Sequence, residues 1–227
     1  MANDVNACIE GAFRGGADTV VIRDGHGDGV NLDPETIDSR AKLIQKATPG
    51  IRFPELDGSD ALILLGYHAM AGTPGALLEH TYSSKSYQNM WVNGIKSGEV
   101  LIDAAIAGEH GAPVIMLSGD DKTLTEAAKI MPDVAFCQVK TSSGLEKSKS
   151  LPFSEAHAQI TDLTANAVKR YCEFKPFQVD YPVTLKVEMV ERFQREKLSG
   201  VIWPDPFDCR ICEKNGDNLE KLFFELL

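Results

Sequence analysis

Short β-branched runs alternate with longer helical patterns along most of this chain, and this alternation constrains the fold more than any other feature. An amphipathic stripe of Val5, Ile9 and Phe13 predicts an opening helix that ends at Gly15-Gly16. Later strand-like runs lie at 19–23, 61–65, 114–117, 134–139 and 185–190, with helical patterns at 99–107, 122–130, 155–171 and 219–227. Residues 90–95 predict a hairpin around Asn93-Gly94. We therefore expect an α/β fold, in which a mostly parallel sheet is flanked by helices.

Composition excludes several classes of partner and location. The 227 residues include 33 acidic and 23 basic side chains, a net charge of −10. This balance argues against binding to nucleic acid or to an anionic membrane surface, because both require an excess of Lys and Arg. No apolar run approaches a spanning helix, and residues 1–6 do not resemble a signal peptide. An odd count of five cysteines suits a reducing compartment, so we expect a cytoplasmic protein.

Two histidines follow strand-like runs directly, within glycine-rich turns. His26 comes after the run at 19–23 and His68 after the run at 61–65. In a parallel sheet both turns lie at the carboxyl edge, where ligands bind in open α/β folds, so the two rings can converge. Glu99, between the hairpin and the next helix, can reach the same edge, and histidines with a carboxylate are a zinc ligand set. His80 is a candidate proton shuttle because histidine titrates near neutral pH.

Each of these residues also has a purely structural interpretation. A histidine in a glycine turn is often a solvated loop residue, and Glu99 by itself fits the first turn of a helix. Asp120-Asp121 favours a helix N-cap over a ligand pair. The glycines at 25, 27 and 29 do not complete a dinucleotide-binding pattern, and a histidine at the third position weakens a calcium loop. The single pair Cys209 and Cys212 favours structural thiols over a zinc ribbon.

Taken in order, the local motifs resemble one family. The specific block is Gly66-Tyr67-His68-Ala69-Met70-Ala71-Gly72-Thr73-Pro74-Gly75. Shorter matches in the expected order are Asn6-Ala7, Ile9-Glu10-Gly11-Ala12-Phe13, Asp24-Gly25-His26, His80-Thr81, Asn93-Gly94, Gly98-Glu99, Ala107-Gly108, Gly111-Ala112-Pro113-Val114, Gly119-Asp120-Asp121 and Val139-Lys140. The chain is similar to the zinc-dependent D-aminopeptidases found with bacterial dipeptide transport systems. The resemblance is strong over 1–171 and weak over 172–227, and we expect a single α/β domain over 1–227.

The resemblance implies an active site, a substrate and an assembly. It assigns His26, His68 and Glu99 as metal ligands and His80 as the catalytic histidine, in a two-zinc site within ring-like homo-oligomers. The implied reaction releases N-terminal D-amino acids from short peptides. Bound metal lowers the pKa of a water to about 7 and polarises the scissile carbonyl, while His80 assists proton transfer.

The resemblance also implies a difference at the start of the chain. Family members open with a strand that ends in Asp-x-Glu-Gly, whose carboxylates supply further ligands, whereas Met1 aligns inside the following helix. We therefore expect a chain truncated at its N-terminus relative to the family, with one zinc or none and impaired activity. Two alternatives stay open: a metal-dependent hydrolase of another amide or ester, and an inactive member that binds peptide or metal or acts as an assembly subunit.

Overall fold

The computed structural model describes residues 1–192, 198–205 and 207–227. The elements in chain order are α1 (Ala2–Gly15), β1 (Val21–Arg23), β2 (Lys42–Ile44), β3 (Leu62–Leu64), β4 (Tyr87–Val92), β5 (Ile95–Ser97), α2 (Glu99–Glu109), β6 (Val114–Asp120), α3 (Asp121–Ala127), β7 (Ala135–Gly144), β8 (Lys147–Ser150), α4 (Phe153–Lys169), a short 3-10 helix (Tyr171–Glu173), β9 (Val183–Met189), β10 (Ile211–Gly216) and α5 (Leu219–Leu226).

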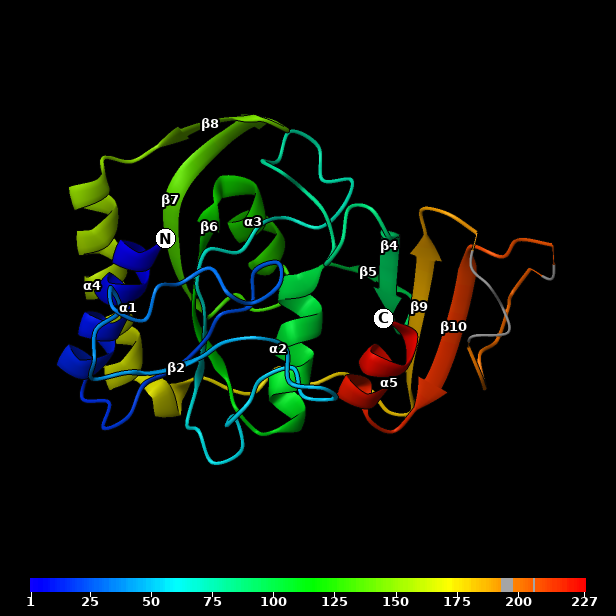
Figure 1. Cartoon of the computed structure of the whole chain (residues 1–227), viewed down its shortest axis with the longest axis horizontal. Coiled ribbons are helices and arrows are strands. Elements are labelled where there is room, and N and C mark those ends of the chain that lie inside the picture. Colours follow the sequence, from blue (N-terminus) through cyan, green and yellow to red (C-terminus); the bar gives the residue numbers. More distant parts are fainter. Residues whose placement is uncertain (193–197, 206) are drawn as a thin grey trace.

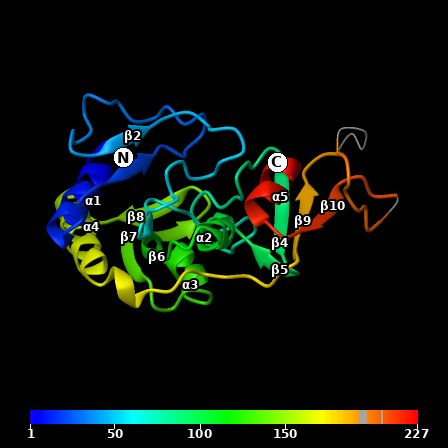
Figure 2. The same cartoon turned by 90° about the horizontal axis from the view of Figure 1, so that it is seen from below.

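A helix-flanked sheet in the order β3-β6-β7-β8 forms the body of the molecule (Figure 1). The β3–β6 and β6–β7 pairs are parallel, and the edge strand β8 is antiparallel. One face packs through Ile115 and Cys137 on α1 and α4, and the other packs through Leu117 on α2 and α3 (Figure 2). All seven residues of β6 are buried, as a strand covered on both faces requires. The expected α/β class with a mostly parallel, helix-flanked sheet is confirmed.

A second sheet, in the order β10-β9-β4-β5, is antiparallel throughout. Strand β9 alternates buried and half-buried residues, because one side packs on α5 and α2 and the other remains accessible. Figure 1 shows this sheet projecting from the body, with β9 and β10 outermost. The sequence predicted the β4–β5 hairpin and a strand at β9, but not their pairing with each other.

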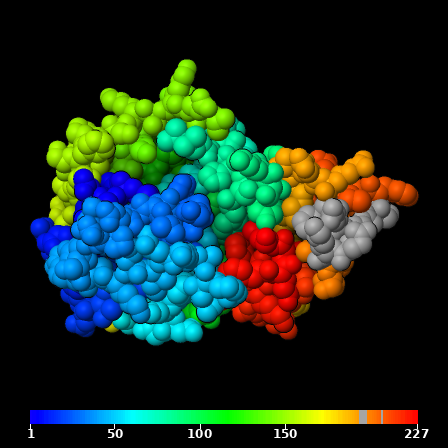
Figure 3. Space-filling model, viewed as in Figure 1, coloured from blue at the N-terminus to red at the C-terminus, as the bar shows by residue number. Residues whose placement is uncertain are grey.

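The N-terminal segment adds a separate two-stranded parallel sheet, β1-β2. Val5 and Ile9 of α1 pack beneath it against Leu32 and Ile37. The helix ends where Gly16 adopts a left-handed conformation (φ 101°), as the glycine pair predicted. Figure 3 shows the N-terminal part of the chain and α5 side by side on one face, and the backbone N–H of Arg52 donates to Glu220 of α5 at 2.6 Å.

Among residues 1–192, 198–205 and 207–227, no helix is long and apolar enough to cross a membrane.

Candidate metal and catalytic site

Three segments of the chain meet at this site. His68 lies in the loop after β3, His80 lies twelve residues further along the same connection, beyond a turn at Gly75, and Glu99 is the first residue of α2. The loop that carries His68 is fixed to the end of β6: Tyr67 N–H donates to the Ser118 carbonyl at 3.0 Å. The strand ends of the central sheet therefore position this histidine.

Gly98 explains how the loop after His68 approaches α2 so closely. A Cβ at this position would lie 2.5 Å from the Met70 side chain, a distance that real side chains do not show. Only glycine leaves room for the loop there. The Gly98-Glu99 pair thus places the start of α2, and with it the Glu99 carboxylate, against the loop of His68.

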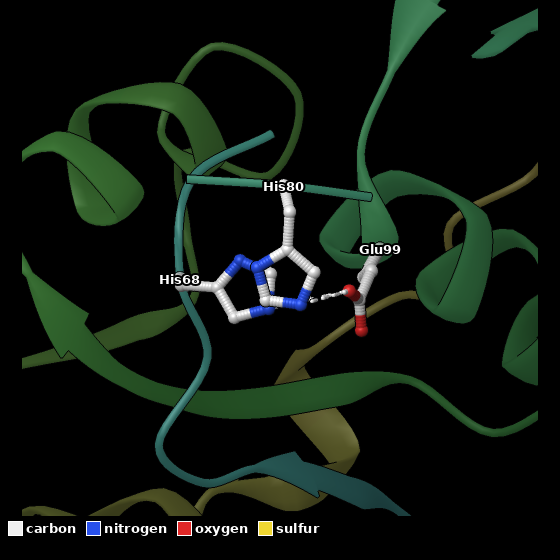
Figure 4. A group of neighbouring side chains, drawn as sticks. All are labelled: His68, His80 and Glu99. Carbon is white, nitrogen blue, oxygen red and sulfur yellow. Dashed lines mark ion pairs between the residues drawn. The ribbon is translucent and has the colours of Figure 1, made fainter. Parts of the chain in front are cut away.

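The side chains of His68, His80 and Glu99 converge on a small volume (Figure 4). One ligand atom from each lies within 4.8 Å of the others. His68 Nε2 is 3.2 Å, and His80 Nε2 3.8 Å, from the same Glu99 Oε1. The two imidazole rings stack, with centroids 3.9 Å apart and an interplanar angle of 18°. All three side chains are half-buried, so the site is open to a small molecule from solvent.

Backbone carbonyls orient both imidazoles. His68 Nδ1 lies 3.1 Å from the Ala69 carbonyl and His80 Nδ1 lies 2.7 Å from the Leu78 carbonyl. A carbonyl only accepts, so each Nδ1 carries the proton and donates it. Each Nε2 then faces Glu99 and is the ring nitrogen left to hold a metal or to exchange a proton, which is the arrangement typical of histidines that bind metal.

Burial and mutual attraction act in opposite directions on the ionisation of this group. Burial alone lowers the pKa of His68, but the adjacent Glu99 outweighs it and raises the pKa above its ordinary value. Burial likewise raises the pKa of Glu99, while His68 and the N–H of Tyr82 bring it below its ordinary value. The site therefore favours a charged carboxylate, which is the form that a dication requires.

His26 occupies a different place from the other predicted ligands. It is exposed in the loop after β1, and it is not one of the three residues whose ligand atoms converge. The buried Asp24 orders this loop by accepting from the Asn31 and Leu32 N–H groups at 2.6 and 2.9 Å. The structure thus brings together His68, His80 and Glu99, and the role of His26 as a ligand stays a prediction.

Two carboxylates beside the site, the half-buried Glu126 and the fully buried Asp103, were missed by sequence reasoning. Glu126 of α3 accepts from Met70 N–H at 3.1 Å, and burial raises its pKa. Asp103, one turn after Glu99 in α2, has no exposed surface. A signal for Asp103 was available, since it is the one charged residue within the apolar stretch 100–108. A lone carboxylate in such a stretch requires buried partners.

Other motifs keep structural roles. Asp120 is the N-cap of α3 and accepts from the Thr123 N–H, as the sequence predicted. Cys209 and Cys212 carry free thiols, and burial raises the pKa of Cys212 to about 11. Neither cysteine belongs to the converging group.

The donor set at this site fits zinc. Two imidazole nitrogens and a carboxylate oxygen are among the preferred ligands of Zn²⁺, and three protein ligands leave a position open for water or substrate. The separation of 3.2 Å between His68 Nε2 and Glu99 Oε1 also suits two atoms that share a tetrahedral ion with bonds of about 2.0–2.2 Å.

Comparison with known proteins identifies the family. A family model described as D-aminopeptidase matches residues 1–214. A D-aminopeptidase of Bacillus subtilis (strain 168) is 30% identical over 200 residues, which cover 86% of this chain and 72% of that protein. The solved structure of the zinc-dependent D-aminopeptidase DppA from Bacillus subtilis, described as a self-compartmentalizing protease, superimposes with a TM-score of 0.91 at 25% identity, covering 99% of this chain and 82% of that one. The chain therefore belongs to the D-aminopeptidase family.

Proposed function

We propose that this protein is a zinc-dependent aminopeptidase that releases N-terminal D-amino acids from short peptides. The convergence of His68, His80 and Glu99 carries the proposal, because it joins two oriented imidazole nitrogens to a charged carboxylate at an accessible place. Membership of the D-aminopeptidase family and the likeness to a zinc-dependent relative support the same reaction.

His68 and Glu99 would hold the metal, with His26 as a further ligand. When bound there, zinc supplies a Lewis acid for the scissile carbonyl and a water of lowered pKa. The ligand role of His26 is supported by its place directly after β1, which parallels that of His68 after β3, and by the ordered turn that carries it. Asn31 of that turn donates to the His26 carbonyl at 2.5 Å.

His80 would handle the proton. Its Nδ1 donates to the Leu78 carbonyl, so Nε2 is free to accept a proton from the attacking water and to return it to the leaving amine. Stacking on His68 holds the His80 ring beside the metal ligands. His80 Nε2 stays 3.8 Å from Glu99 Oε1, which is too far for a hydrogen bond. This arrangement allows His80 to move a proton while His68 stays in place.

We further infer that the protein works as a homo-oligomer in the cytoplasm on short peptides. The self-compartmentalizing character of DppA supports an assembly of identical chains. The five cysteines, all within the described residues, are free thiols, which suits a reducing compartment.

The test combines zinc binding with turnover. Equilibrium dialysis should give bound zinc for the parent protein, and a loss of about tenfold or more in affinity for His68→Ala and Glu99→Gln. The parent should hydrolyse D-alanyl amide faster than L-alanyl amide. His157→Ala is the matched control, since His157 is a half-exposed residue of α4 paired with Asp4. It should change neither result.

Two outcomes would contradict the proposal in different ways. Zinc binding without turnover of either amide would favour an inactive family member that binds metal or peptide. Faster turnover of another amide or of an ester would favour a hydrolase with a different substrate.

A further inference from the structure

The buried Asp103 receives hydrogen bonds from three different segments of the chain. Its Oδ1 accepts from Arg52 Nε at 2.8 Å and from the Tyr82 hydroxyl at 2.9 Å. Its Oδ2 accepts from Arg52 Nη2 at 2.8 Å and from the Tyr67 hydroxyl at 2.7 Å. Four bonds from one cation and two hydroxyls satisfy a carboxylate whose side chain has no exposed surface.

Each tyrosine that donates to Asp103 lies within two residues of one histidine of the candidate site. Tyr67 directly precedes His68, and Tyr82 follows His80 by two residues. Asp103 itself is four residues after Glu99, on the same face of α2 one turn later. The Tyr82 N–H also donates to Glu99 Oε1 at 2.7 Å. One carboxylate thus connects the two segments that carry the histidines to the helix that carries the glutamate.

The backbone around His80 explains why this segment needs an anchor. Leu78 and Tyr82 flank the histidine symmetrically, and both have positive φ angles, 50° and 58°. Such conformations are unfavourable for bulky residues and persist only where surrounding contacts enforce them. Leu78 is exposed, whereas the ring of Tyr82 packs edge-on against Phe223 and lies beneath the Arg52 guanidinium. The strained turn is therefore fixed from the Tyr82 side.

We propose that Asp103 is the positioning residue of this site, holding His68, His80 and Glu99 in register through Tyr67, Tyr82 and Arg52. Only the expected loss of turnover rests on the proposed function; the positioning of the three side chains does not. Asp103 does not reach the reacting atoms, because its oxygens are occupied by Arg52 and the two hydroxyls. Its effect is on the geometry of the rings, which must be kept within about 0.5 Å for a productive site.

The test removes single hydroxyl groups. Tyr67→Phe, Tyr82→Phe and the double variant keep both rings but leave Asp103 with fewer donors. Tyr87→Phe is the matched control, because this half-buried tyrosine donates its hydroxyl to the Leu227 carbonyl at 3.0 Å, away from the site. The first measurement is the set of imidazole ¹H–¹⁵N resonances of His68 and His80 in zinc-free protein, assigned with His68→Ala and His80→Ala.

We expect the His68 resonances to move in Tyr67→Phe, the His80 resonances in Tyr82→Phe, and neither in Tyr87→Phe. Zinc affinity and kcat on D-alanyl amide should fall about 10–100-fold in the double variant, with the melting temperature of each single variant within a few degrees of the control. Unchanged imidazole resonances in the double variant would overturn the proposal. The resonances need neither zinc nor turnover, so they decide the positioning role even if the parent proves inactive and the proposed function fails.

Discussion

At the scale of single residues, His110 has an electrostatic role separate from the candidate site. It caps the end of α2 and lies between two carboxylates, with Nδ1 2.6 Å from Asp57 Oδ1 and Nε2 3.1 Å from Glu220 Oε2. Burial lowers the pKa of His110, but the two carboxylates outweigh it and raise the pKa above 6.5. The protonated ring thereby joins α2 to α5 and to the loop before β3.

The raised pKa of His110 predicts a pH-dependent stability. A group whose pKa is higher in the folded state stabilises the fold below its unfolded pKa of 6.5, and this stabilisation is lost as pH rises through the folded value. The difference in unfolding free energy between the parent and His110→Gln should thus shrink between pH 6 and pH 9. Denaturant titrations of both proteins at several pH values measure this difference in unfolding free energy. A difference that stays constant with pH would contradict the prediction.

His80→Ala separates proton transfer from metal binding. We expect turnover of D-alanyl amide to fall by about 10²–10⁴, the usual contribution of a general acid–base group. Zinc content should be unchanged, because His68 and Glu99 would still hold the metal. Parallel loss of zinc and activity would instead make His80 a ligand, as its place among the converging atoms also permits.

His26→Ala tests the third proposed ligand. If His26 completes the zinc site, its removal should weaken zinc binding by about tenfold or more in competition with a chromophoric chelator. The loop should keep its shape, because Asp24 and Asn31 hold it without the imidazole. Zinc affinity equal to that of His157→Ala would remove His26 from the site.

Sequence reasoning identified His68 and Glu99 from their places beside a predicted strand and a predicted helix, and His80 as a titratable histidine to which the family resemblance gave a catalytic role. The role of Asp103 could not be predicted, since its partners Arg52, Tyr67 and Tyr82 come from positions up to 51 residues away and have no common motif. The partners of His110 are equally remote, with Glu220 110 residues further along the chain.

At the scale of elements, α1 and α4 approach each other through glycine. A Cβ on Gly11 would lie 2.5 Å from the Thr161 carbonyl oxygen and 2.8 Å from the Thr164 Cβ. The Thr161 hydroxyl donates across the same contact to the Ala7 carbonyl at 3.0 Å. The two helices therefore meet backbone to backbone where they cross.

Gly11→Ala should destabilise the protein by about 1–3 kcal/mol, because the overpacking exceeds any gain in helix propensity. Equilibrium denaturation measures the change. Gly25→Ala is the control, since its φ is not positive and nothing lies within 4 Å of the added methyl group. A Gly11→Ala variant as stable as the Gly25→Ala protein would show that the helices can move apart freely.

The elements that sequence predicted well are those with strong local signals. The glycine pair ended α1, Asp120 began α3, and the apolar run predicted β6. Strands β2, β8 and β10 were missed because their residues lack the period-two apolar pattern: all four residues of β8 are exposed. Their conformation depends on pairing with a neighbouring strand, which the local sequence does not specify.

At the scale of the whole molecule, the connection between β9 and β10, at the projecting end of the antiparallel sheet, presents apolar residues to solvent. Phe207 is 94% exposed, and Val190 and Ile202 of the same connection are also exposed. Exposed large apolar side chains on a projecting part of a molecule are typical of contact surfaces between proteins. Pairing of Val92 with Leu185 builds this sheet across 93 residues, which explains why sequence alone did not predict it.

Sedimentation should therefore give a particle several times heavier than the 24.8 kDa chain. Phe207→Ser should shift the distribution toward the single chain, because it removes an exposed ring from the connection between β9 and β10. Phe153→Ser is the comparison, since Phe153 is 80% exposed at the start of α4, on the opposite end of the molecule in Figure 1. A parent protein that sediments as a single chain would contradict the assembly.

Helix α2 connects the two sheets, and nine of its eleven residues are buried. Leu101 and Ile102 pack in the core of the antiparallel sheet, while Val100 and Ala104 pack in that of the central sheet. We expect its hydrogen-bonded amides to exchange with deuterium only when both cores open, and those of the short strands β1 and β2 to exchange through local fluctuations. Glu99 begins this helix, so an ion bound there would be attached to an element that can move only if both cores rearrange.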